Sequence, residues 1–326
     1  MNLDEKGIGG VSEMTASVLV TGKLLPETMK ALEKWQVETI IGEELTEENL
    51  IKKAAKVDAI ICPLSTQITA KVLESAENLK IVANIGAGFD NIDVKKAKEL
   101  GIAVTNTPDV STEATAELTL GLILAVARRI TEGDRLCRET PKEFKGWAPT
   151  FFLGTELTGK TLGIIGLGRI GQAVAKRAVA FGMKIIYSGH NQKDWDAEFV
   201  SQEELLKRSD VVTIHAAYNP DLKHLINEET LRMMKPSAFL INAARGPVVE
   251  EAALVKALKN EEIAGAALDV FEFEPKIGEE LRGLDNVVLT PHIGNATIET
   301  RSEMGRMAIS NVEAVLAGKA PIHSVY

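Results

Sequence analysis

The segment KTLGIIGLGRIGQAVAKRAVAFG, residues 160–182, constrains the fold more than any other part of the chain. It begins with a short run typical of a β-strand, continues through GLGRIG, and ends in a stretch with the apolar spacing of a helix. A G-x-G-x-x-G turn between a strand and a helix is typical of dinucleotide-binding units. The N-terminus of such a helix offers N–H groups and partial positive charge to a diphosphate.

Each glycine of this turn has its own predicted role. Gly166 would permit a tight turn, Gly168 a close approach of the backbone to the diphosphate, and Gly171 close packing of the helix on the strand. Arg169 and Ile170, which open the helix, belong to the same predicted cofactor site. The alternative is a glycine-rich turn that binds no ligand.

Short β-rich runs alternate with helical stretches along the 326-residue chain, which indicates an α/β protein with parallel sheets and crossover helices. The length suffices for two domains. The early predicted strands are 17–22, 37–41, 57–64, 80–86 and 102–107. The later ones are 160–165, 184–188, 210–216, 237–244, 263–270 and 286–291.

Three longer segments complete the predicted order. We expect residues 113–130 to form an apolar helix that is buried or bridges two domains. Residues 131–159 are expected to be irregular and rich in aromatic contacts. A last helix is predicted over about 297–317, with Gly318 as the residue that ends it.

Composition excludes several classes of partner. A net charge of −9 argues against nucleic acid and against an anionic membrane, and no run approaches the ~20 apolar residues of a membrane span. Cys62 and Cys137 show neither CxxC nor metal-ligand spacing, so no metal is expected and both should be buried, reduced thiols of a cytoplasmic protein. Residues 1–13 lack the features of a signal peptide and are expected to form a disordered leader.

Ionisable residues follow three of the later predicted strands. Arg245 follows SAFLINAA, Glu274 lies in LDVFEFEP after Asp269, and His292 lies in VVLTPHIG. Open α/β sheets place their sites at the carboxyl ends of the strands, so these side chains are candidates for catalysis. Taken singly, Arg245 could make a surface ion pair, Glu274 could be a solvated loop carboxylate, and His292 could be a packed structural histidine.

Together with the glycine turn, these segments resemble the three signatures of the D-isomer-specific 2-hydroxyacid dehydrogenases, from about residue 17 to the C-terminus. AGFDNID, VTNTPDVSTEATAEL and LTPHIGNAT resemble in particular the glyoxylate/hydroxypyruvate reductase branch. The resemblance implies a doubly wound Rossmann-type nucleotide domain over 111–295. This domain would be inserted into a flavodoxin-like substrate domain made of 1–110 and 296–326, with catalysis in the cleft between them. It also implies a homodimer, to which 113–130 and 140–153 could contribute; packing within one chain is the alternative.

The resemblance assigns roles to individual residues. It implies that Arg245 binds the carboxylate and carbonyl of a 2-keto acid, that His292 donates the proton, and that Glu274 pairs with His292. The chemistry suits these types, because hydride addition to a ketone leaves an alkoxide that needs a general acid, and the arginine fork matches a carboxylate. Backbone N–H groups of Ala87 and Gly88 would bind the substrate carboxylate. Asp269 would contact the nicotinamide carboxamide or its surroundings.

The expected function is therefore NAD(P)H-dependent reduction of a small 2-keto acid of the glyoxylate or hydroxypyruvate type to the D-2-hydroxy acid. Other family members, D-3-phosphoglycerate or D-lactate dehydrogenase, are the nearest alternatives. The loop CPLST shows no basic cluster for a phosphorylated substrate, and we expect no appended regulatory domain after residue 326. A corepressor-like scaffold that senses NAD(H) is the alternative from another class.

The second strand of the nucleotide unit ends in KIIYSGHNQK, residues 184–193. Ser188 lies 22 positions after Gly166, where an acid would hold the ribose of NAD. A serine does not repel a 2′-phosphate, and His190, Asn191 and Lys193 add donors, so the sequence favours NADP(H), with NAD(H) possible. The resemblance adds that NADP-using members have arginine at the position of His190, which weakens the expectation and leaves a solvated polar turn open.

Overall fold

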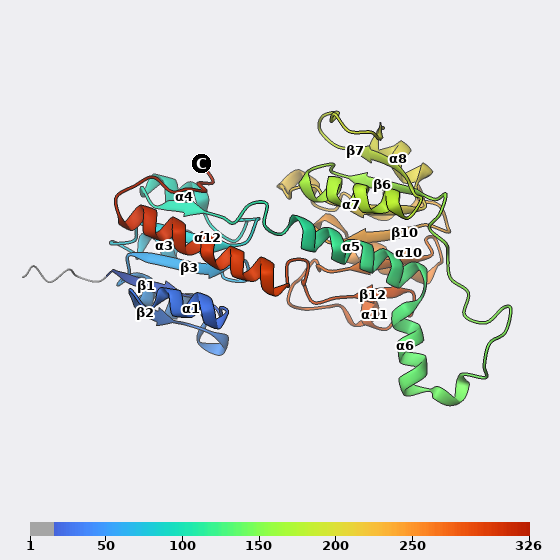
Figure 1. Cartoon of the computed structure of the whole chain (residues 1–326), viewed down its shortest axis with the longest axis horizontal. Helices are drawn as coiled ribbons and strands as arrows, with labels where there is room; N and C mark the ends of the chain where they lie inside the picture. Colours follow the sequence, from blue (N-terminus) through green and yellow to red (C-terminus); the bar gives the residue numbers. More distant parts are fainter. Residues whose placement is uncertain (1–15) are drawn as a thin grey trace, which may run out of the picture. The chain divides into compact units, whose positions relative to one another are not determined.

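The computed structural model describes residues 16–326, so the leader expected over 1–13 lies outside the described residues. Two compact units form the chain (Figure 1). The first comprises the chain up to Val110 together with Ile298–Tyr326, and the second comprises Ser111–Thr297. Which unit binds the substrate and which the cofactor stays a prediction at this point.

A five-stranded parallel sheet forms the centre of the first unit, with the order β2-β1-β3-β4-β5. Its strands are β1 (Ser17–Val20), β2 (Gln36–Thr39), β3 (Ala59–Pro63), β4 (Ile81–Ile85) and β5 (Ala103–Thr105). The helices between them are α1 (Pro26–Leu32), α2 (Glu47–Ala54), α3 (Ala70–Glu74) and α4 (Val94–Glu99), with a 3₁₀ turn η1 (Gly42–Glu44). All five residues of β4 are buried, as expected for a parallel strand covered on both faces.

One helix of the first unit comes from the far end of the chain. This helix, α12 (Ile298–Leu316), packs Met304, Ala308 and Val312 against apolar residues of β1, β3 and β4 (Figure 1). Gly318 has φ +73°, and the N–H of Lys319 donates to the Ala314 carbonyl, so the helix ends in the predicted way.

The second unit has a seven-stranded parallel sheet with the order β12-β11-β10-β9-β6-β7-β8. The strands are β6 (Thr161–Ile165), β7 (Lys184–Ser188), β8 (Glu198–Phe199), β9 (Val211–Ile214), β10 (Phe239–Asn242), β11 (Gly265–Leu268) and β12 (Val287–Leu289). The chain builds β6, β7 and β8 outward in one direction, then returns to add β9 beside β6 and proceeds the other way. This is the doubly wound nucleotide-binding order, so the predicted fold class is confirmed.

The helices of this unit cover both faces of the sheet. They are α5 (Thr112–Ala127), α6 (Ile130–Glu139), α7 (Arg169–Ala180), α8 (Gln202–Arg208), α9 (Glu228–Arg232), α10 (Glu251–Lys259) and α11 (Glu279–Arg282), with 3₁₀ turns η2 (Pro141–Glu143), η3 (Pro220–Leu222) and η4 (Gly246–Val248). Nine of the 16 residues of α5 are buried, and the helix packs on α7, β10 and β11, which confirms the burial predicted for the apolar segment.

The sequence prediction was wrong directly after α5. The expected helix over 113–130 ends at Ala127, and a separate helix, α6, occupies the start of the segment that was expected to be irregular. The break lies at Arg129, which has φ +55° and forms an ion pair with Glu132, while its guanidinium stacks 4.2 Å from the Phe152 ring. No residue of α6 is buried, and most of its residues are polar or charged, which is unusual for a core helix.

The two cysteines differ. Cys62 is buried in β3, and this burial raises the pKa of its thiol to about 12. Cys137 is exposed, so the expectation of two buried thiols was wrong for it, because it lies on the helix without buried residues. Within residues 16–326, no helix is both long enough and apolar enough to cross a membrane.

Candidate active site

The glycine turn lies between β6 and α7, at the carboxyl edge of the seven-stranded sheet. Gly166 has φ +94°, and a Cβ atom there would lie 2.6 Å from the backbone nitrogen of Ala216. A Cβ atom at Gly171 would lie 2.4 Å from the carbonyl oxygen of Gly166. These two glycines are therefore required by the turn and by close packing.

Gly168 differs, because a Cβ atom there would meet nothing within 4 Å. The residue caps the N-terminus of α7, which begins at Arg169 and continues through Ile170. Open space at the end of a 12-residue helix suits an anion, since the first N–H groups of a helix point outward along its axis. The geometry of the turn thus fits the diphosphate of a dinucleotide.

The loop after β7 is the predicted ribose end of the cofactor site. Ser188 is buried, and its carbonyl accepts the N–H of Gly166 at 2.9 Å, which joins the strand to the glycine turn. His190, Asn191 and Lys193 are all exposed beyond it. They thus form a polar edge around a buried serine.

Tyr187 fixes this loop, a role that sequence reasoning missed. Its side chain is 1% exposed, and its hydroxyl oxygen accepts the N–H of Lys193 at 2.7 Å and lies 3.2 Å from the Lys193 carbonyl. The hydroxyl therefore holds the backbone that carries the Lys193 side chain. The available signal was a tyrosine next to the last residue of a buried strand.

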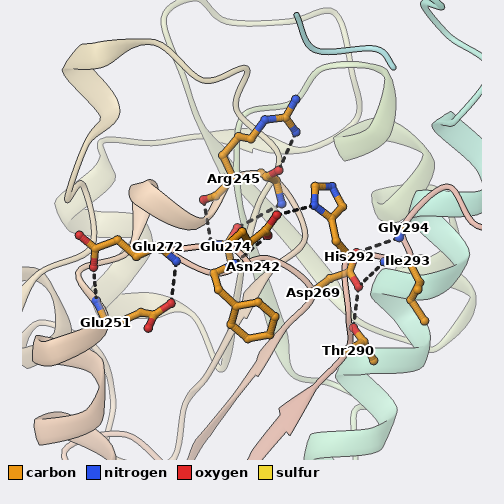
Figure 2. Close-up of polar contacts among 12 residues, drawn as sticks. Asn242, Arg245, Glu251, Asp269, Glu272, Glu274, Thr290, His292, Ile293 and Gly294 are labelled. Atoms are coloured by element: carbon orange, nitrogen blue, oxygen red, sulfur yellow. Dashed lines mark hydrogen bonds and ion pairs between the residues drawn. The ribbon is translucent and has the colours of Figure 1, made fainter. Parts of the chain in front are cut away.

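A second group of side chains lies beyond β10, β11 and β12 of the same sheet (Figure 2). His292 Nδ1 lies 2.9 Å from Glu274 Oε2, and the N–H of Phe271 donates to Glu274 Oε1 at 3.0 Å. The two paired side chains are 34% and 35% exposed, so the pair is open to a ligand. His292 Nε2, on the other side of the ring, has no hydrogen-bond partner among residues 16–326.

Electrostatics keep Glu274 ionised. Burial works to raise the pKa of this carboxyl, but the hydrogen bond and charge of His292, the Phe271 N–H and the charge of Arg245 together lower it. The structure thus brings Arg245, Glu274 and His292 into one electrostatic group, as the sequence predicted for side chains at the ends of neighbouring strands.

The turn that carries Arg245 packs directly on the loop that carries Glu274. A Cβ atom at Gly246 would lie 1.8 Å from the carbonyl oxygen of Phe271, so only glycine allows this backbone-to-backbone contact. Asn242 also shapes the turn, since its Nδ2 donates to the Arg245 carbonyl at 3.0 Å. Arg245 itself is half-buried, and its Nη1 donates to the Ala244 carbonyl at 2.9 Å.

Asp269 organises the loop of His292. Its side chain is buried, Oδ1 accepts the Thr290 hydroxyl at 2.7 Å and the Ile293 N–H at 2.8 Å, and Oδ2 accepts the Gly294 N–H at 2.8 Å (Figure 2). The N–H of His292 donates to the Asp269 carbonyl at 2.8 Å. These bonds hold His292 in its left-handed conformation, φ +53°. A contact of Asp269 with the nicotinamide stays a prediction.

A pair of glutamates holds the Glu274 loop to α10, which the sequence did not reveal. Glu272 accepts the N–H of Glu251 at 3.0 Å, and Glu251 accepts the N–H of Glu272 at 2.6 Å (Figure 2). Burial raises the pKa of Glu251, and the charges of Glu272 and Glu274 add to this although the Glu272 N–H opposes it. His224 Nε2 lies 2.6 Å from Glu272, so this histidine faces the glutamate pair instead of the catalytic group.

The remaining predicted residues lie elsewhere. Ala87 and Gly88 belong to the first unit, in the turn after β4, and their participation in one site with Arg245 stays a prediction. His215 ends the β9 segment; burial lowers its pKa to about 3, and its Nδ1 has no partner within the described chain.

Comparisons with known proteins identify the family of the chain. The sequence profile of the D-isomer specific 2-hydroxyacid dehydrogenase NAD binding domain matches residues 120–294. A Staphylococcus aureus protein (strain MRSA252), whose name assigns it only to the 2-hydroxyacid dehydrogenases, is 52% identical over 311 residues, 93% of this chain and 98% of its own.

Two of the similar solved structures each cover 95% of the chain. The TT0316 protein from Thermus thermophilus has a TM-score of 0.91 at 44% identity, over 95% of this chain and 100% of that one. An NADPH-dependent glyoxylate/hydroxypyruvate reductase from Sinorhizobium meliloti, in complex with NADP and malonate, has a TM-score of 0.87 at 32% identity, over 95% and 97%. The chain belongs to the D-isomer specific 2-hydroxyacid dehydrogenase family, oxidoreductases that act on a CH–OH group with a nicotinamide dinucleotide.

Proposed function

We propose that the protein reduces a small 2-keto acid of the glyoxylate or hydroxypyruvate type to the D-2-hydroxy acid, with NADPH preferred. The His292–Glu274 pair within the electrostatic reach of Arg245 carries this proposal. These residues supply one proton donor, one carboxylate and one planar cation, which are the groups that 2-keto acid reduction needs. The likeness to the Sinorhizobium meliloti reductase supports the substrate class.

The chain's residues divide the work as follows. A bound nicotinamide dinucleotide supplies the hydride. Arg245 binds the substrate carboxylate and polarises the carbonyl oxygen with its fork of donors. His292 gives its proton to that oxygen from Nε2, because Nδ1 is engaged by Glu274. The ionised Glu274 pairs with Nδ1 and fixes the orientation of the ring, which leaves Nε2 for the substrate oxygen.

The preference for NADPH rests on the loop after β7. Ser188 has no charge to repel a 2′-phosphate, and Lys193 is an exposed cation on a backbone fixed by Tyr187. Cationic and hydrogen-bonding side chains at this position favour a phosphate over a ribose hydroxyl. His190 and Asn191 provide further exposed donors.

Phosphorylated substrates are the nearest alternative. The turn after β3 contains Leu64, Ser65 and Thr66, and Thr66 is buried with its hydroxyl donating to the Thr21 carbonyl at 3.1 Å. Because this turn contains no cationic side chain, it offers little to bind the phosphate group of a phosphorylated substrate. This turn supports the proposal of a small unphosphorylated acid.

A spectrophotometric panel tests the proposal. NADPH and NADH are each followed with glyoxylate, hydroxypyruvate, pyruvate and phosphohydroxypyruvate. We expect the highest kcat/KM with glyoxylate or hydroxypyruvate and NADPH. A clear NADH preference contradicts the proposed phosphate pocket, and a preference for phosphohydroxypyruvate contradicts the substrate class. Absence of any turnover would favour the NAD(H)-sensing scaffold.

We also propose that two copies associate through the segment after α5. Ile130, Phe144, Trp147 and Leu153 are all exposed, with Trp147 at 87%. Several large apolar side chains exposed on one segment favour a protein partner, and the second copy is the one that is always present. Light scattering should give a dimer mass for the wild type and a lower mass for Trp147→Ser. An unchanged mass excludes this segment as the interface.

A further inference from the structure

In the turn after β4, three successive carbonyl oxygens each accept a hydrogen bond from elsewhere in the first unit. The carbonyl oxygen of Gly86 accepts the N–H of Thr107 at 2.9 Å. The Ala87 carbonyl accepts Asn106 Nδ2 at 2.7 Å, and the Gly88 carbonyl accepts Asn84 Nδ2 at 2.6 Å. The first unit therefore binds every carbonyl of this short run.

Occupied carbonyls determine where the N–H groups point. In a trans peptide the C=O and N–H bonds point in opposite directions, and the plane between them is rigid. Fixing the Gly86 carbonyl thus fixes the direction of the Ala87 N–H, and fixing the Ala87 carbonyl fixes the Gly88 N–H. Neither N–H has an acceptor within residues 16–326. Both donors point away from the groups that hold their planes, and an anion can bind them.

Asn84 is built into the core beneath the turn. Its side chain is 1% exposed, and its Oδ1 accepts Asn91 Nδ2 at 3.2 Å. Asn91 Nδ2 also donates to the Thr66 carbonyl at 2.9 Å, so the network continues into the turn after β3. Because Oδ1 of Asn84 already has a donor, its Nδ2 is the atom left to face Gly88. The network thus sets the orientation of the amide.

Asn106 provides the more exposed of the two amide contacts. It directly follows β5 and reaches the Ala87 carbonyl across a sequence separation of 19 residues. Removing this side chain leaves the surrounding apolar core intact, since the bond lies at the surface of the unit. The residue therefore offers a way to disturb the turn without disturbing the fold.

We propose that Asn106 is a positioning residue that orients the Gly88 N–H group toward the substrate carboxylate, and that Asn84 anchors the same turn through the next carbonyl, that of Gly88. The inference rests on the proposed function, a 2-keto acid reductase, together with the expectation from the family resemblance that the Ala87 and Gly88 N–H groups bind the substrate carboxylate. Neither asparagine touches the substrate. Their effect is on KM, because a donor that is free to rotate binds an anion less well than one whose direction is fixed.

The central test compares Asn106→Ala with Asn49→Ala. Asn49 is a matched control, because it is, like Asn106, a half-buried asparagine of the same unit whose Nδ2 donates to a backbone carbonyl, that of Glu44, at 3.0 Å. We expect Asn106→Ala to raise KM for glyoxylate about 10-fold, with the NADPH dissociation constant unchanged. Asn49→Ala should leave both unchanged. An equal KM in the two variants overturns the proposal.

Amide hydrogen exchange provides a readout that does not depend on turnover. Exchange at the buried Thr107 N–H, which donates to the Gly86 carbonyl of this turn, should accelerate in Asn106→Ala and not in Asn49→Ala, because the turn loses one anchor. Asn84→Asp keeps the side-chain shape but replaces the donor with an acceptor, and should have the same two effects. If the wild type reduces no 2-keto acid, the proposed function fails, while the exchange comparison still decides whether the asparagines fix the turn. Unchanged exchange in both Asn106→Ala and Asn84→Asp rejects the positioning role.

Discussion

The two halves of the seven-stranded sheet differ in which groups form the candidate sites at their carboxyl ends. On the side of β6 and β7 the predicted diphosphate site consists of backbone, with glycines that either close the turn or leave room beside it. On the side of β10, β11 and β12 it consists of ionisable side chains whose positions depend on other carboxylates and on backbone N–H groups. The first half is sensitive to volume, and the second is sensitive to charge and hydrogen-bonding capacity.

The largest effect should come from the charged half. His292→Asn removes the imidazole but retains a residue type that tolerates the left-handed backbone. We expect kcat to fall on the order of 10²–10⁴-fold with NADPH binding unchanged. His224→Asn is a matched control, because His224 also has φ +55° and pairs with a glutamate. Equal losses in the two variants would exclude His292 as the specific proton donor.

The glycine half can be divided by two alanine substitutions. Gly171→Ala should destabilise the protein by about 1–3 kcal/mol, because its Cβ meets the Gly166 carbonyl. Gly168→Ala should leave the midpoint of thermal unfolding almost unchanged and raise KM for NADPH, because its Cβ enters the space beside the α7 N-terminus. Gly121→Ala, also with nothing near its Cβ, is the control. Normal NADPH kinetics in Gly168→Ala contradict the predicted diphosphate position.

The choice between NADPH and NADH tests whether side chains of the loop after β7 contribute to cofactor binding. Tyr187→Phe removes the hydroxyl that holds Lys193 and should lower the preference for NADPH over NADH by a few-fold, about the effect of one hydrogen bond. The kcat/KM for NADH should stay unchanged. Lys193→Ala, which removes the cation itself, gives the largest loss of NADPH preference expected from this loop. A preference altered by Lys193→Ala but not by Tyr187→Phe would show that the loop needs no anchor.

The smallest effect concerns acid stability. The pKa of Glu274 is lowered in the folded state, so its stabilising contribution is present above the range in which free glutamates titrate and is lost as pH falls through the folded pKa. Glu274→Gln lacks this dependence. Urea unfolding from pH 7 to pH 3 should therefore show a gap that closes in acid, of less than about 1 kcal/mol for a pair so exposed to solvent. A gap that widens in acid contradicts the lowered pKa.

Sequence reasoning located the elements that carry strong local signals. The glycine turn, Arg245, Glu274 and His292 were predicted because strand ends and their polar residues are adjacent in sequence. The bonds that hold them were not predictable, since Glu251 and Glu272 are 21 residues apart and Asn106 is 19 residues from Ala87. Such pairs meet only after the sheets have assembled, and no local periodicity marks them.

Errors in the fold had a similar cause. The chain breaks at Arg129 through a left-handed residue whose guanidinium stacks on Phe152, a contact that a periodic pattern does not contain. The error about Cys137 had the same origin, because this exposed cysteine lies on α6, a helix that the sequence did not predict. The edge strand β8 is only two residues long and has both side chains exposed, so it carried no apolar signal.

The helix α12 has a consequence for how the protein is synthesised. A ribosome releases all five strands of the first unit and then the whole second unit before α12 is made. Until then the sheet face that α12 covers, with Val18, Val20, Ile61 and Ile85, lacks its partner helix. The inserted unit can fold first, while the unit that begins earlier in the chain is completed last. Nascent chains stalled before residue 298 should therefore need a chaperone at that apolar face.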